Sequence, residues 1–183
     1  VFMCYDTNSS KVIFSYIDST PNFYTVSASY SSGTYTFGTI NSSFGKMGAL
    51  SGITFDSKRN KALVSFYDNS NSYGSILPVS ISGTSMVLGT KVNINLSHVY
   101  SNIVYNPMST RSLLYQGKIT APASRKFILC SNLAGGGVGL SKDVAANHTA
   151  DAGGFSLDTF NRYALFSWAI YGSKPKIMAM KIS

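Results

Sequence analysis

The sequence predicts an all-β fold in which each stretch of about 50 residues forms an antiparallel sheet of four strands. One observation is the composition of the 183 residues, of which 44% are hydrophobic and 13% aromatic, as expected for a globular chain with a real core. Tyr, Phe, Ser, Thr, Val and Ile dominate, and most of these residue types favour strands. A second observation is that all seven acidic residues are Asp, which favours turns, and none is Glu, which favours helix interiors.

The third observation is an internal repeat. Apolar segments end in an acid or amide at Asp6, Asp56, Asn106 and Asp158, at intervals of 50, 50 and 52 residues. A short polar turn and a second apolar strand follow each of them. Matched positions at a fixed spacing indicate repeated supersecondary units. We therefore treat 1–183 as one region with repeats 1–51, 52–101, 102–153 and 154–183.

Further strands follow in each repeat. The third strands are "FYTVSASYS", "SILPVSIS", "KFILCSN" and "KIMAMKIS". Gly33–Thr34 and Gly83–Thr84 then turn the chain, and Gly135–Gly136 has that role in the third repeat. Fourth strands, "YTFGTI", "MVLGTKVNI" and "GVGLSKDV", close the first three repeats, and the last repeat stops after its third strand. No helical periodicity of useful length interrupts this order.

This period and strand order predict a β-propeller made of four-stranded antiparallel blades. A lone sheet cannot bury its apolar faces, so blades pack face to face around an axis. A β-sandwich does not usually repeat matched positions every 50 residues, and solenoid coils are shorter, about 20–30 residues. We expect three full blades and part of another from a larger ring, or a ring completed by residues outside this sequence. Because the first residue is not Met, we also expect a piece of a longer or processed protein.

The acid or amide that ends each first strand has an expected structural role. Its side chain can cap the following turn by accepting a hydrogen bond from a backbone N–H two residues on. We therefore interpret Asp6, Asp56, Asn106 and Asp158 as turn residues rather than as catalytic groups.

Charge and cysteine content limit the classes of partner. Fifteen Lys and Arg against seven Asp give a net charge of +8, but the basic residues are scattered, so we expect no nucleic-acid partner. No apolar stretch reaches the roughly 18 residues of a membrane span, so we expect no membrane insertion. Cys4 and Cys130 lie in apolar runs without zinc or disulfide spacing, which predicts buried free thiols.

One repeat carries a resemblance to a known family. "NKALVSFYDNSNSYGS" followed by "VSISGTSMVLGT" resembles a repeat of structural proteins of tailed bacteriophages, in which Tyr-Asp, a polar loop ending in Gly and a Ser-Gly-Thr turn recur. The match is best over 54–90 and looser over 1–40, while 105–140 and 155–183 keep only the strand pattern. The resemblance implies a non-enzymatic virion protein, a tail fibre or tail tip, that forms a homo-oligomer and contacts other virion proteins. It carries over no catalytic residues.

Topology indicates where a ligand would bind. In an antiparallel blade, the loops between second and third strands lie on the same face as the connections between blades. Acids, amides and aromatic residues in these loops suit sugars, through hydrogen bonds to hydroxyls and stacking on the ring, so a host-surface glycan is the expected ligand. The candidate ligand-binding residues are Asp18, Asp68, Asn69, Asn71, Tyr73, His98 and His148.

Other chemistry finds less support in the sequence. A calcium loop at "DNSNSYG" would need the late bidentate Glu of an EF-hand, and glycoside hydrolysis would need a carboxylate pair. His98 and His148 are 50 residues apart, at equivalent positions of adjacent repeats, but no Cys/His/Asp cluster has metal-ligand spacing. Nucleophile elbow, P-loop and dinucleotide motifs are missing. We predict no enzymatic activity, no metal and no cofactor. The alternative is a secreted carbohydrate-binding propeller lectin or a fragment of a sugar-processing enzyme.

Overall fold

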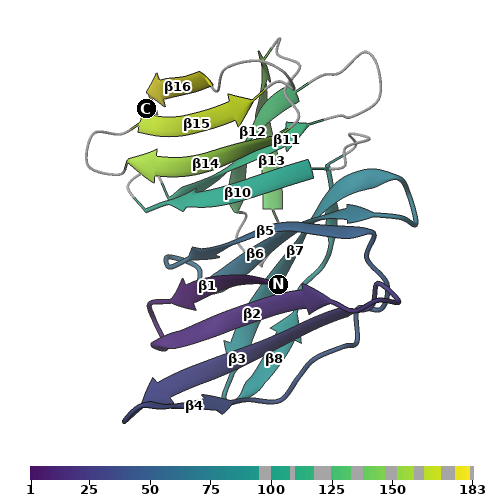
Figure 1. Ribbon diagram of the computed structural model, residues 1–183, viewed down its shortest axis with the longest axis vertical. Coiled ribbons are helices and arrows are strands. Elements are labelled where there is room, and N and C mark those ends of the chain that lie inside the picture. Colours follow the sequence, from purple (N-terminus) through teal and green to yellow (C-terminus); the bar gives the residue numbers. More distant parts are fainter. Residues whose placement is uncertain are drawn as a thin grey trace.

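The chain forms four consecutive antiparallel sheets in a computed structural model (Figure 1). The structure describes residues 1–94, 100–107, 110–117, 125–132, 138–146, 152–158, 163–169 and 176–181; beyond residue 94 it describes side chains only at 102–107, 110–112, 114 and 179. Every element assigned in these residues is a strand, which confirms the all-β prediction. No helix in this part of the chain is long and apolar enough to cross a membrane.

Each sheet follows the order of the sequence, and within it each strand pairs with the next, except for the short β9. The first sheet contains β1 (Phe2–Asp6), β2 (Lys11–Ile17), β3 (Phe23–Ser31) and β4 (Thr34–Phe37). The second contains β5 (Ala49–Asp56), β6 (Lys61–Asp68), β7 (Tyr73–Ser82), β8 (Ser85–Leu88) and the short β9 (Val92–Asn93), which pairs with β7. The third contains β10 (Tyr100–Asn106), β11 (Arg111–Gly117), β12 (Arg125–Asn132) and β13 (Val138–Ala146). The fourth contains β14 (Ala152–Asp158), β15 (Tyr163–Ala169) and β16 (Lys176–Lys181).

The turns that follow β1 and β5 are closed by the last residue of the strand. Asp6 is 1% exposed, and its Oδ1 accepts hydrogen bonds from the N–H of Asn8 (2.8 Å) and Ser9 (3.1 Å). Asp56 accepts from the N–H of Arg59 (3.1 Å), three residues on. The expected turn-capping role is therefore confirmed for Asp6 and Asp56. The side chain of Asp158 lies outside the described residues.

The same turn recurs with the same backbone strain. The last residue before β2, β6 and β11 has a left-handed φ in each case: 55° at Ser10, 55° at Asn60 and 54° at Thr110. Non-glycine residues seldom adopt this conformation, so its return every 50 residues marks one turn type used three times. The turns of neighbouring repeats are also joined, because Asn8 Nδ2 donates to Ser57 O (2.8 Å).

The hairpin between third and fourth strands differs from the prediction by one residue in the first repeat. Ser31 pairs with Thr34, so the turn residues are Ser32 and Gly33, with φ of 51° and 83°. In the second repeat Ser82 pairs with Ser85, and the turn residues are Gly83 and Thr84, as predicted. The two positive φ values of the first hairpin are typical of a type I′ turn, whose backbone twist matches that of the flanking strands. The Gly-Thr pair thus occupies different turn positions in the two repeats.

The fourth strand is also shorter than predicted in the first two repeats. Gly38 ends the pairing of β4, and its N–H donates to Ser27 O (2.8 Å), while Gly89 does the same after β8 by donating to Pro78 O (2.8 Å). The chain then resumes beside the third strand, by a bridge between Thr25 and Asn41 in the first repeat and by β9 in the second. The interruption at each glycine is a local irregularity that re-aims an outer strand.

The sheets are stacked so that apolar faces meet. A core between the first and second sheets includes Ile13 and Phe23 from one side and Val64, Phe66 and Leu77 from the other, all 0% exposed. A second core joins Leu63 and Ile76 of the second sheet to Ile103 and Leu114 of the third. The first sheet and strands β14–β16 lie at opposite ends of the long axis (Figure 1). The stack therefore remains open between its two ends.

Cys4 packs against the first of these cores and is a free thiol, as predicted, but it is half-buried rather than fully buried; the Cys130 side chain lies outside the described residues. Burial, with a smaller effect of the nearby Asp6 carboxylate, raises the pKa of Cys4 to about 12. Because the thiolate is the nucleophile, we expect Cys4 to react with iodoacetamide at pH 8 far more slowly in the folded chain than in urea. Mass spectrometry of the peptide that contains Cys4 measures this. Equal rates in the two conditions would contradict the burial of the thiol.

Candidate functional site

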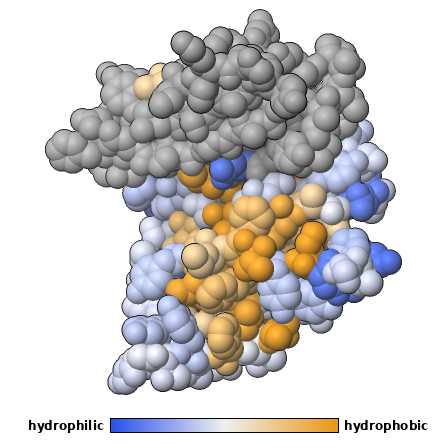
Figure 2. Space-filling view, in the orientation of Figure 1, coloured by the Kyte–Doolittle hydropathy of each residue, from blue (hydrophilic) through white to orange (hydrophobic). Residues whose placement is uncertain are grey.

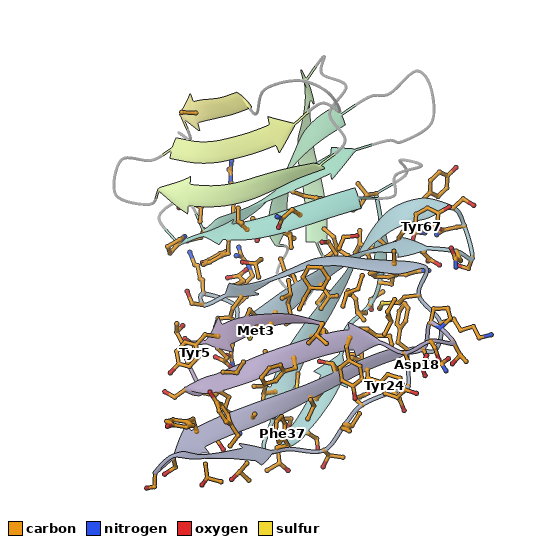
Figure 3. The ribbon with its side chains drawn as sticks, viewed as in Figure 1. Met3, Tyr5, Asp18, Tyr24, Phe37 and Tyr67 are labelled. Carbon is orange, nitrogen blue, oxygen red and sulfur yellow. The ribbon has the colours of Figure 1, made fainter. Side chains whose placement is uncertain are left out.

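The loops that follow second strands gather at one edge of the first two sheets. The backbone of Asn22 bridges that of Lys46, and Met47 N–H donates to Pro21 O (2.8 Å). Gly48 N–H then donates to Tyr67 O (2.8 Å), next to the following loop. The connection between the sheets thus ties their loops together, as the topology predicts. We call residues 18–22, 41–48 and 68–73 the loop edge; Asp18, Tyr24 and Tyr67 mark this side of the molecule in Figure 3.

Asp18 organises the first loop of this edge. Its Oδ1 accepts hydrogen bonds from Thr20 N–H (2.8 Å), Thr20 Oγ1 (2.9 Å) and Asn22 N–H (2.9 Å). Its Oδ2 accepts from Tyr24 Oη (3.0 Å) and Asn22 Nδ2 (3.4 Å). Both carboxylate oxygens therefore serve the fold of the loop. A ligand that bound Asp18 would have to displace these bonds.

These bonds also change two pKa values. Partial burial acts to raise the pKa of Asp18, but the hydrogen bonds from Asn22, Thr20 and Tyr24 outweigh it and lower the pKa to about 2. For Tyr24, the hydrogen bond to Asp18 raises the hydroxyl pKa, and burial and the Asp18 charge act in the same direction. At neutral pH the pair is therefore a tyrosine hydroxyl that donates to a carboxylate.

The Asp18 carboxylate should titrate far into the acid range. Its pKa is lower in the folded chain than the unfolded value of about 3.9, so its contribution to stability is present above pH 4 and is lost as the pH falls toward 2. We expect an NMR titration of the side-chain carboxyl carbon to give a midpoint near pH 2. Tyr24→Phe should raise that midpoint, because it removes one donor, whereas Tyr16→Phe should leave it in place. An unchanged midpoint in Tyr24→Phe would contradict the Tyr24–Asp18 hydrogen bond.

A tyrosine pair lies beside Asp18 and was not among the predicted site residues. Tyr16 and Tyr24 are directly paired between β2 and β3, and their rings are stacked with centroids 5.2 Å apart and planes 14° apart. Both side chains are half-buried. The signal in the sequence is their symmetric placement around the loop, since each is two residues from an end of 18–22. Recognising it requires the exact register of the hairpin.

Asp68 is the first residue and the one acid of the segment "DNSNSYG", and its environment is that of a turn-capping residue. It is 2% exposed, and its Oδ1 accepts from Ser70 N–H (2.9 Å) and Ser70 Oγ (2.6 Å). Its Oδ2 forms an ion pair with Lys91 from the connection after β8. Burial acts to raise the pKa of Asp68, but Lys91 and Ser70 lower it below its usual value. The carboxylate therefore faces the protein, and Ser72, with φ of 61°, completes the same four-residue turn that follows Asp6.

The other candidate residues differ in their accessibility. Asn71 Oδ1 accepts from Tyr73 N–H (3.0 Å) within its own turn, and the side chain of Asn69 lies against the backbone of Gly48. Tyr73 is 38% exposed. Together with Asp68 these residues form one compact loop, and Asp18 belongs to the neighbouring loop of the same edge. His98 and His148 lie outside the described residues.

The chemistry open to the loop edge is recognition by hydrogen bonds and ring contact. Its exposed residues include Ser42, Ser43, Lys46, Ser70 and Tyr73, although the hydroxyls of Ser43 and Ser70 already donate to Asn41 and Asp68 within their own turns. Among the residues described by the structure, no three His, Cys, Asp or Glu side chains are grouped so that they could hold a metal ion. No protein-family model matches the sequence, and no curated protein matches it.

Proposed function

We propose that this chain is a non-enzymatic structural module of a tailed-phage virion, part of a tail fibre or tail tip, and acts as a rigid scaffold. The observation that carries the proposal is the stacking of successive antiparallel sheets on matched apolar faces. The second and third sheets each add the same kind of core contact to the sheet before them, which stiffens this part of the array. Rigidity of this kind suits a spacer or a docking platform.

The finer architecture that we propose is a β-propeller. Its support is that residues 50 apart, Val64 and Leu114, occupy the same position in two successive interfaces, and that their partners Ile13 and Leu63 are also 50 apart. Identical interfaces between identical units generate a regular rotation from one sheet to the next, which is how propeller blades are arranged. In this proposal the sheets are blades of a ring that includes further blades.

The loops support a scaffold rather than a catalyst. The four acids whose side-chain bonds are described, Asp6, Asp18, Asp56 and Asp68, all accept hydrogen bonds from backbone N–H groups of their own turns, and Asp56 also binds the guanidinium of Arg59. A general acid or base needs to reach a substrate proton, and these carboxylates are directed into the fold. The proposed partners are other virion proteins and further copies of the chain.

The virion assignment is supported by the resemblance of 54–90 to repeats of phage structural proteins, and it can be tested directly. Antibodies raised against the chain should label one end of tailed particles in immunogold electron microscopy. Mass spectrometry of purified particles should find its peptides in proportion to an appendage protein. Free protein in the medium with unlabelled particles would contradict the proposal and favour the secreted lectin.

A glycan-binding function of the loop edge is a second part of this proposal, favoured by the exposed Tyr73 ring beside amides and hydroxyls. Exposed aromatic rings stack on the apolar faces of sugars, and neighbouring polar groups bind the hydroxyls. We expect binding on an array of bacterial surface glycans, weakened by Tyr73→Ala and Lys46→Ala. Lys58→Ala, at an exposed lysine in the turn between β5 and β6, is the matched control. If no glycan binds, or if all three variants bind equally, the loop edge is not the binding face, whereas the scaffold proposal is tested separately by particle labelling.

A further inference from the structure

The polar turns that follow β1, β5 and β10 lie side by side on one edge of the stack. In Figure 1 the arrowheads of these three strands are on the same side of the molecule. The turns are joined in pairs, because Asn8 Nδ2 donates to Ser57 O (2.8 Å) and Arg59 Nη1 donates to Thr110 O (3.0 Å). Each second strand runs from these turns to the loop edge, so the turns are on the opposite side of the sheets. We call residues 6–11, 56–61, 106–107 and 110–111 the turn edge.

The turn edge repeats a basic residue at one position. Lys11, Lys61 and Arg111 are 50 residues apart, and each begins the second strand of its sheet. Each is paired with the acid or amide that ends the first strand, and each follows the residue with the left-handed φ. Because the same turn presents each of them and neighbouring turns are in contact, these positions form a row from sheet to sheet, with a step of about 10 Å as expected for packed sheets.

The charges that reach the surface at the turn edge have one sign. Its acids, Asp6 and Asp56, are 1% and 0% exposed and accept hydrogen bonds from their own turns. The loop edge, by contrast, combines Lys46 with Asp18 and Asp68. The basic residues of the turn edge are half-buried or exposed; they are Lys11, Lys58, Arg59, Lys61 and Arg111. The fold thus gathers on one edge cations that are scattered in the sequence.

Three of these cations are available to a ligand. Arg59 and Lys11 already join neighbouring repeats, since Arg59 donates to Thr110 O and Lys11 Nζ donates to Gly83 O (2.7 Å). The remaining three form no ion pair with any acid whose side chain is described; they are Lys58, Lys61 and Arg111. The turn edge runs along the side of the stack, so sheets added at either end would lengthen it and would not cover it.

The other side chains of these turns indicate the class of ligand. Figure 2 shows the apolar residues of the first two sheets gathered in the middle, with more hydrophilic residues along both edges. Residues 7–10 are "TNSS" and residues 57–60 are "SKRN", so the turns offer hydroxyls and amides and contain no aromatic ring. Hydroxyls and amides bind sugar hydroxyls, and Lys and Arg bind carboxylate, sulfate or phosphate groups. Sites for single-stranded nucleic acid add aromatic rings on which the bases stack. The turn edge therefore suits an acidic sugar polymer better than a nucleic acid.

We propose that the turn edge binds an anionic polysaccharide that lies along the stack, with its acidic groups at Lys58, Lys61 and Arg111. The repeat places a cation at the same position of each of the first three sheets, and a polymer with regularly spaced charges can contact several of them at once. The inference does not rest on the proposed function, because it uses the edge opposite to the loop edge and requires neither a virion nor the Tyr73 ring.

Binding of two labelled polymers to the purified chain tests this proposal: heparin, which carries sulfate groups, and polygalacturonate, which carries carboxylates. Fluorescence anisotropy should show that at least one of them binds, and that its affinity falls steeply as NaCl is added, because salt screens exposed charges. Labelled neutral dextran should not bind. Lys58→Ala, Lys61→Ala and Arg111→Ala should each lower the affinity by roughly two- to fivefold, the range for an exposed ion pair. The triple variant should lose more than any single one.

Lys46→Ala is the matched control, since it removes the same charge from an exposed lysine on the loop edge. It should lower the affinity for heparin or polygalacturonate less than the turn-edge variants do. A glycan bound at the loop edge would show the reverse order, with a larger loss in Lys46→Ala than in Lys58→Ala. The failure of either site is therefore distinguishable from the failure of the other. Circular dichroism melts establish that each variant folds.

Three results would overturn the proposal. The first is that neither anionic polymer binds. The second is an equal loss in Lys46→Ala and in the turn-edge variants, which would mean attraction by net charge alone. The third is that labelled oligothymidylate binds more tightly than both polymers and through the same residues, which would assign the turn edge to nucleic acid.

Discussion

Phe66→Ala should destabilise the chain by about 3–5 kcal/mol, the range for removal of a large buried aromatic side chain. Phe66 is 0% exposed and lies in the core that joins the first two sheets. Its ring meets the ring of Phe44 edge to face, with centroids 5.4 Å apart. The truncation leaves a cavity between two sheets that cannot easily collapse, because both are held by their own hydrogen bonds. Equilibrium unfolding in urea measures the loss.

Phe37→Ala is the matched control for Phe66→Ala. Phe37 is the same residue type in a strand of the same pair of sheets, but it is 61% exposed. Its truncation should cost less than about 1 kcal/mol, as for a surface position. Similar losses in the two variants would contradict the assignment of Phe66 to the core between the sheets.

Gly38→Ala is expected to have the next largest effect. Overpacking costs about 1–3 kcal/mol of the free energy of unfolding, and we expect this variant near the upper end of that range. A Cβ atom at Gly38 would lie 2.1 Å from Thr84 O, and this obstacle is backbone rather than a flexible side chain. The next residue, Thr39, donates its N–H to the same oxygen (2.9 Å) and so joins the first sheet to the second. The methyl group would force these backbones apart. A thermal melt followed by circular dichroism measures the change.

Gly33→Asn separates this steric effect from the general cost of replacing a glycine. Gly33 has a φ of 83°, and nothing lies within 4 Å of a Cβ built there. Asn tolerates this backbone conformation better than most residues, so a small loss is expected. If Gly33→Asn were as destabilising as Gly38→Ala, the close approach of Gly38 to Thr84 would not explain the effect.

Most strands and turns could be predicted from short stretches of sequence, because the same residue pattern returns in each repeat. The strand "FYTVSASYS" is β3 from end to end, and the turns that follow Asp6 and Asp56 are closed by those carboxylates as expected. Alternation of side chains along a strand needs only the residues of that strand. Asx turns similarly depend on a carboxylate and the next few backbone N–H groups.

The candidate site was less predictable, because its bonds join residues far apart in the chain. Asp68 and Lys91 are 23 residues apart and meet only because the connection after β8 returns to the loop of β6 and β7. Tyr16 and Tyr24 stack only when β2 and β3 adopt one register. A shift of one residue would place the two rings on opposite faces of the sheet.

Local sequence alone specifies strands, turns and the order of the sheets, since each follows from short-range patterns and a repeat of about 50 residues. Only the tertiary structure decides which face of each sheet is covered. Tyr35 and Met86 occupy the same position of the repeat, yet one is 55% and the other 3% exposed. The reason is physical: in the first two sheets both faces carry apolar residues, so burial depends on whether a neighbouring sheet is present, and that is a property of the stack rather than of the strand.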